Sequence, residues 1–223
     1  MKHITTLFLF LFLLNTSQFL GQTDVKIEGK LKKWHKVTLS FQSETLSEHD
    51  EDNPFLNYRL NVIFRHKDKV MTVPGFYAAD GNASETSAAS GNVWQVRFTP
   101  DEAGAWTYEA FFRKGKNIAV SDAIYAGEPT AFNGTKGTFN IAEADETGSA
   151  FRTKGRLQYD GSRYLKYADT HEAFLKGGAD SPENFLGYYE FDQTPSKHKY
   201  EAHAKDFKSG DPTWKNGKGK NII

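Results

Sequence analysis

Apolar and polar side chains alternate along most of the stretch from Gly29 to Ile141. A period of two predicts β-strands, because successive side chains of a strand point to opposite faces of its sheet. Turn residues separate the runs, as in an antiparallel sheet with one face on a core and one in water. About six or seven short strands of this kind predict a β-sandwich of immunoglobulin-like type. The clearest runs are Val37–Phe41, Tyr58–Phe64, Lys69–Val73, Trp94–Phe98, Trp106–Phe112 and Gly137–Ile141.

The pattern changes after Ile141. Residues 142–154 are small or polar without a period, which indicates a linker. Asp160-Gly161 then separates two alternating runs and predicts a β-hairpin. From Phe174 to Leu186 a short apolar run passes through two glycines into a polar loop and a helix start. That order is typical of the first strand of a (β/α) barrel, and we place the strand at residues 173–179.

The length of the chain conflicts with a complete barrel. A (β/α)₈ barrel needs roughly 250 residues, and the chain ends at Ile223. We therefore expect a mainly β chain: an immunoglobulin-like β-sandwich at 23–141, a linker at 142–154, and the truncated beginning of a (β/α)₈ barrel at 155–223. The terminal Asn221-Ile222-Ile223 looks like a helix just beginning and favours a fragment boundary.

The N-terminus is typical of a secretory signal. Met1-Lys2-His3 is basic, and Ile4–Leu14 is almost wholly apolar but too short for a membrane-spanning helix. We expect cleavage between Ser17 and Gln22, with a retained anchor as the less favoured alternative. The predicted signal is 1–22 and the predicted location is secreted or periplasmic. The chain has no cysteine, so the core alone must stabilise the fold.

Charge and motifs exclude several classes of function. The chain has 28 basic and 28 acidic residues, which gives no electrostatic attraction to nucleic acid or, after signal cleavage, to a membrane. It contains no Gly-x-Ser-x-Gly elbow, phosphate loop or dinucleotide fingerprint. We expect no cofactor. The oligomeric state is not predicted.

Polar residues after the predicted barrel strand are the first candidate site. Loops at the C-terminal ends of barrel strands build the active site, so Asp180, Glu183 and Asn184 are predicted to contact substrate hydroxyls. The same segment also fits any helix start, with Ser181 as N-cap and Pro182 at the first helical position. Both interpretations stay open.

Aromatic residues are the second candidate. Trp94, Trp106, Phe76 and Tyr77 could stack on sugar rings. The two tryptophans are in phase with the inward-facing positions of their strands, however, which favours a place in the core.

Metal ligation and catalysis find little support. The acidic run Glu48–Asn53 lacks the spacing of a calcium loop, and His171, His198 and His203 lack the spacing of a zinc site. We interpret both sets as solvated surface and expect no metal site. The paired carboxylates that glycoside hydrolysis requires are not identifiable, so no catalytic residue is assigned.

Two segments resemble a known family. Val73–Asn82 and Gly91–Trp106 resemble the N-terminal domain of unknown function 5060, an immunoglobulin-like sandwich found ahead of barrel domains in secreted bacterial carbohydrate-active proteins. Phe174–Phe191, with the hairpin before it, resembles the start of their glycoside hydrolase barrel. The resemblance implies a polysaccharide-degrading enzyme exported by a bacterium of the Bacteroidetes type.

The favoured hypothesis is the N-terminal fragment of a secreted glycoside hydrolase, with an accessory sandwich that supports the catalytic barrel. This chain alone is then inactive, and polysaccharide is the partner of the full-length barrel. The alternatives are a non-catalytic carbohydrate-binding sandwich and a surface adhesion protein of immunoglobulin-like fold.

Overall fold

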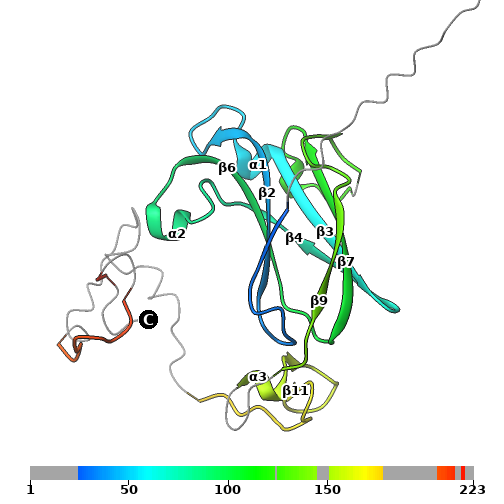
Figure 1. Cartoon of the computed structure of the whole chain (residues 1–223), viewed down its shortest axis with the longest axis vertical. Helices are drawn as coiled ribbons and strands as arrows, with labels where there is room; N and C mark the ends of the chain where they lie inside the picture. The colour runs from blue at the N-terminus through cyan, green and yellow to red at the C-terminus, as the bar shows by residue number, and fades with distance from the viewer. Residues whose placement is uncertain (1–24, 124, 145–150, 178–204, 214–216, 219–223) are drawn as a thin grey trace, which may run out of the picture.

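The computed structural model describes residues 25–123, 125–144, 151–177, 205–213 and 217–218. Two antiparallel sheets pack face to face and form a β-sandwich (Figure 1). The first sheet has the order β1 (Lys26–Glu28), β2 (Val37–Ser47), β6 (Ser90–Phe98), β5 (Phe76–Tyr77). The second has the order β4 (Lys69–Pro74), β3 (Tyr58–His66), β7 (Gly104–Lys114), β8 (Glu128–Pro129), and β9 (Lys136–Ile141) also pairs with β7. The predicted sandwich is confirmed.

The remaining elements are short. They are the helices α1 (Pro54–Asn57), α2 (Ala83–Thr86) and α3 (Phe151–Lys154), the 3₁₀ helix η1 (Ile118–Val120), and the paired strands β10 (Leu157–Gln158) and β11 (Lys166–Tyr167). Within the described ranges, no helix has the length and apolar character needed to cross a membrane.

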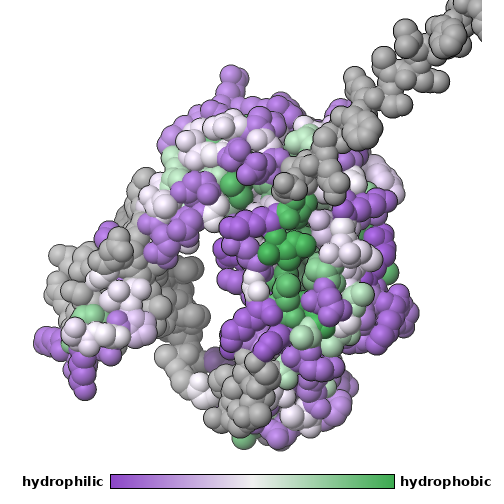
Figure 2. Space-filling model, in the orientation of Figure 1, coloured by the Kyte–Doolittle hydropathy of each residue, from purple (hydrophilic) through white to green (hydrophobic). Residues whose placement is uncertain are grey.

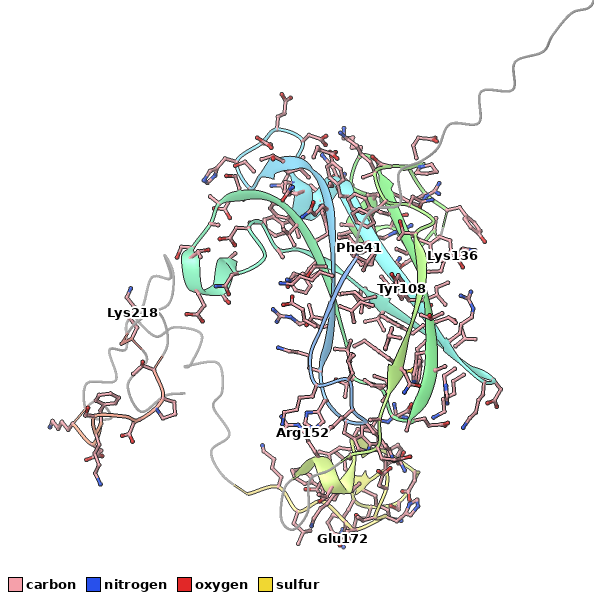
Figure 3. All side chains as sticks on the ribbon, in the orientation of Figure 1. Phe41, Tyr108, Lys136, Arg152, Glu172 and Lys218 are labelled. Carbon is pink, nitrogen blue, oxygen red and sulfur yellow. The ribbon has the colours of Figure 1, made fainter. Side chains whose placement is uncertain are left out.

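The core lies between the two sheets and is rich in aromatic rings. Figure 3 shows Phe41 of β2 and Tyr108 of β7 between the sheets, with ring centroids 6.4 Å apart. Phe64 of β3 stacks on Phe98 of β6 across the same interior, at 4.2 Å. Aromatic side chains bury a large apolar area each, which allows a chain without cysteine to hold two sheets together. The face drawn in Figure 2 is mostly hydrophilic in its coloured part, apart from a hydrophobic stripe between β2 and β9.

The chain passes from one sheet to the other at Pro74-Gly75. Pro74 ends β4 in the second sheet, and β5 begins at Phe76 in the first. The N–H of Gly75 donates to the carbonyl of Leu60 at 2.8 Å, so the glycine backbone lies directly against β3. A Cβ at this position would collide with the Leu60 side chain and come within 2.8 Å of the Gln95 carbonyl oxygen. Only glycine fits the crossing without displacing its neighbours.

The hairpin predicted around Asp160-Gly161 is present, with a longer loop than the dipeptide suggests. Leu157 pairs with Tyr167 and Gln158 with Lys166. Asp160 accepts the Ser162 N–H at 3.0 Å, and Gly161 has a φ of 85°. The aspartate therefore closes a local turn within the loop. The paired residues of the two strands lie on either side of this loop, at 157–158 and 166–167.

The barrel strand expected at 173–179 is not formed by its described residues. Ala173 makes one isolated bridge to Lys166, and the N–H of Phe174 donates to the Leu165 carbonyl at 2.7 Å. Leu175 is 73% exposed. A strand of a parallel sheet needs partner strands beside it, and residues 174–177 have none among the described elements. The strand prediction is wrong for residues 173–177, and no barrel is present in the described part of the chain.

Candidate functional site

The outward face of the first sheet carries a row of side chains from four strands. Strand register places Lys26 of β1 opposite Ser40 of β2, Ser40 opposite Gln95 of β6, and Gln95 opposite Phe76 of β5. Residues directly opposite each other project from the same face. Their neighbours Leu39 and Trp94 are buried, so this row points away from the core.

A groove of about 540 Å³ lies along this face. One side is β1, and the other is the loop at residues 80–82, which follows β5 and leads into α2 (Figure 1). Polar side chains dominate its lining, with Val93 as the apolar exception. The lining residues are Lys26, Glu28, Ser40, Gln42, Asp80, Gly81, Asn82, Val93 and Gln95.

Asp80 fixes the loop that forms one wall of the groove. Its carboxylate accepts the Thr86 hydroxyl at 2.6 Å and the Asn82 N–H at 2.8 Å. These two hydrogen bonds, the one from Thr86 first, lower the pKa of Asp80. The backbone of Ala79, which has a φ of 50°, ties the loop to β6 by accepting the Val93 N–H at 2.9 Å. The wall is therefore held by hydrogen bonds at both ends.

Gln95 forms the floor of the groove. Although it projects outward, it is only 7% exposed. Its amide nitrogen donates to the Ser40 hydroxyl and to the Gly81 carbonyl, both at 3.2 Å. Both amide hydrogens are thereby used, and the amide oxygen is the group of Gln95 that remains for a ligand.

The groove is suited to binding rather than to hydrolysis. A general acid needs a pKa raised toward the working pH, whereas the pKa of Asp80 is lowered and both its oxygens accept hydrogen bonds. Neither a cysteine nor a histidine lines the groove. Among the described residues, no group of three or more His, Cys, Asp or Glu side chains is placed to hold a metal ion.

The structure places the predicted aromatic residues mostly in the core. Trp94 is 2% exposed and Trp106 is fully buried, so the core interpretation is confirmed and a tryptophan stacking platform is wrong. Tyr77 is also buried, and its hydroxyl donates to the Leu46 carbonyl at 2.5 Å. Phe76 alone of the four is exposed, with the Arg97 guanidinium 5.0 Å from its ring centroid.

The other candidates of the sequence contribute no site in the described chain. Asp180, Glu183 and Asn184 lie outside the described residues, as do His198 and His203. His171 is exposed. The acidic run forms a surface loop, in which Asp50 accepts the Ser47 N–H at 2.7 Å and Asn53 caps α1 through the Phe55 N–H at 2.9 Å. Backbone hydrogen bonding thus explains these two polar side chains.

A second feature joins the hairpin to the end of the sandwich. The indole N–H of Trp34 donates to Asp169 at 2.7 Å, and the Lys33 ammonium pairs with the same carboxylate oxygen at 2.8 Å. Burial alone would raise the pKa of Asp169, but the hydrogen bonds from Lys33 and Trp34 outweigh it and lower the pKa. Trp34 itself is buried, and its backbone N–H donates to the Pro100 carbonyl at 2.9 Å.

The alternating pattern could not reveal either feature. It separates inward from outward positions, but only strand register brings Gln95 beside Ser40 and Phe76. Trp34 lies outside the alternating runs at a φ of 63°, and its partner Asp169 is 135 positions away. The one signal in the sequence that could have pointed to this contact was a tryptophan, Trp34, outside any predicted strand.

The fold and groove define a β-sandwich domain with a polar outward face. Residues 30–113 match the family described as "Domain of unknown function (DUF5060)", which agrees with the resemblance of Val73–Asn82 and Gly91–Trp106. A solved structure with similarity is described as that of a "putative glycoside hydrolase" from Bacteroides vulgatus ATCC 8482. It is 25% identical at a TM-score of 0.42, and the match covers 70% of this chain but only 25% of that chain. No curated protein matches.

Proposed function

We propose that this chain is the N-terminal part of a secreted bacterial glycoside hydrolase. Its immunoglobulin-like sandwich is a non-catalytic accessory domain that supports a catalytic barrel. The match of residues 30–113 to a domain family supports this assignment, as does a groove whose best-placed carboxylate is unsuited to acid catalysis. The predicted signal at 1–22 directs the protein to a secreted or periplasmic location, and polysaccharide is its substrate.

The observation that carries the proposal is the anchored hairpin. The Trp34 indole and the Lys33 ammonium both bind Asp169, which follows β11 by two residues. Within the hairpin, the Ala168 N–H donates to the Arg156 carbonyl at 2.8 Å, so the residue next to Asp169 is held against the first strand of the hairpin. A support domain needs such a fixed junction, because the orientation of the catalytic domain then depends on the sandwich. Asp180, Glu183 and Asn184 come soon after this junction and are assigned to substrate contact.

The coding sequence beyond residue 223 tests the proposal. We expect an open reading frame that continues with alternating strands and helices and carries two carboxylates at strand ends. A stop codon directly after Ile223 would overturn the proposal.

Activity of the chain is a second test. The purified 223-residue chain is expected to release no product from aryl glycosides or from soluble polysaccharides, since the paired carboxylates are not assigned within it. Measurable turnover by a sequence-verified preparation would contradict the non-catalytic role.

N-terminal sequencing of the exported protein tests the predicted cleavage between Ser17 and Gln22.

A further inference from the structure

We propose that the groove on the outward face of the first sheet binds a neutral glycan segment. This inference goes beyond the proposed function, because a support domain has no need to bind sugar itself. It rests on the described residues of β1, β2, β6 and the 80–82 loop.

Amide side chains provide the chemistry. Gln42 and Asn82 lie on the rim of the groove, both exposed, and among the described residues neither side-chain amide has a hydrogen-bond partner. Each offers two donor hydrogens and one acceptor oxygen. The amide oxygen of Gln95 adds an acceptor from the floor. Sugar hydroxyls donate and accept at once, so they match such groups better than ligands that only donate or only accept.

The charges of the groove disfavour other ligand classes. Lys26 and Glu28 pair with each other at 2.8 Å and largely cancel, which leaves Asp80 as the remaining charge. Lys26 is the one cationic side chain in the lining, and it is already paired, so an anionic ligand in the groove would meet this carboxylate without an unpaired lining cation to balance it. A metal cation would need oxygen ligands that Asp80 already commits to Thr86 and Asn82. An apolar ligand would bury polar side chains without hydrogen bonds.

The size of the groove and a neighbouring ring fit the same ligand class. A volume of about 540 Å³ falls within the roughly 300–1,000 Å³ of small-molecule sites. Phe76 lies outside the groove lining but projects from the same face directly beside Gln95. It is 37% exposed, with the Arg97 guanidinium 5.0 Å from its ring centroid. An exposed ring next to planar amides supplies an apolar surface for the C–H face of a sugar ring.

Native affinity electrophoresis of the full chain tests this proposal. The gels contain laminarin, galactomannan, arabinoxylan or, as the acidic arm, alginate. We expect at least one of the three neutral polysaccharides to retard the chain, and alginate not to. The double variant Gln42→Ala/Asn82→Ala is expected to weaken the apparent affinity at least about fivefold, as the loss of a ligand hydrogen bond implies.

The control variant is Thr72→Ala/Thr107→Ala, which removes two exposed polar side chains from the second sheet. It should bind as the unchanged chain does, and circular dichroism melting should show that both variants are folded. Retardation by no neutral polysaccharide, retardation that survives the groove variant, or retardation only by alginate would each overturn the proposal. A stop codon after residue 223 would leave glycan binding standing while it removed the proposed function.

Discussion

The sandwich and the hairpin after it are held in different ways. In the sandwich, large side chains such as Trp106 and Phe112 are fully buried between two sheets. The hairpin consists of two strands of two residues each, and its Leu157 is 39% and its Tyr159 71% exposed. An isolated two-stranded hairpin is marginally stable at best. Its position therefore depends on Trp34, Lys33 and Asp169.

This contrast separates two kinds of stability within one chain. Damage to the aromatic core should unfold the sandwich, and the hairpin with it, because its anchor residues Lys33 and Trp34 belong to the sandwich. Damage to the anchor should release the hairpin and leave the sandwich folded. Substitutions in each region, and acid, test this asymmetry.

The largest effect is expected from Phe112→Ala. Phe112 is fully buried and stacks on Phe132 with centroids 4.2 Å apart. Removal of a buried phenylalanine ring costs about 3–5 kcal/mol of the free energy of unfolding. Urea denaturation followed by circular dichroism measures the loss. Tyr125→Ala, which removes a ring that is 79% exposed, is the matched control. Equal losses in both variants would contradict the core assignment.

Gly75→Ala tests the crossing between the sheets. The added methyl group would collide with Leu60, and overpacking of this kind costs roughly 1–3 kcal/mol. Gly177→Ala is the control, because a Cβ at Gly177 meets no atom within 4 Å. The same denaturation experiment compares the two variants. If Gly75→Ala is as stable as its control, the described crossing is incorrect.

Asp169→Asn tests the anchor. The substitution keeps an acceptor for the Trp34 indole but removes the charge that pairs with Lys33, at a cost of about 1–2 kcal/mol. We expect amides such as that of Ala168 to exchange hydrogen about tenfold faster, while amides of β3 and β7 keep their protection. The control is Asp68→Asn on the exposed β3–β4 turn. Faster exchange throughout the sandwich would show that the two regions are not separable.

The sequence was sufficient to predict the long strands, because apolar and polar residues alternate along the central part of each of them. The prediction of Gly137–Ile141 differs from β9 by one residue. The strands β1, β5 and β8, with two or three residues each, are too short to show a period. The barrel strand failed for a different reason. The apolar run Phe174-Leu175 has the composition of a buried strand, but burial requires partner elements, and Leu175 has none in the described part of the chain.

The candidate site was less predictable than the fold. Gln95 occupies an outward position, where a polar residue normally indicates solvent, yet the 80–82 loop covers it. The residues just before that loop, Ala78 and Ala79, are bound to Val93 of β6 through backbone hydrogen bonds, which carry no side-chain signature in the sequence. The register of four strands and the path of one loop together create the groove, and neither follows from local pattern.

The smallest effect is expected from acid. The pKa of Asp169 is lower in the folded chain than its ordinary value of about 3.9. A carboxylate with a lowered pKa stabilises the fold above its unfolded-state pKa, and this contribution is lost as pH falls through the folded-state value. Hairpin exchange, corrected for intrinsic rates, should therefore rise relative to that of β3 and β7 below about pH 4. Asp169→Asn cannot titrate at this position and should lack that relative rise, so a rise of equal size in the variant would assign the acid sensitivity to other carboxylates and not to the anchor.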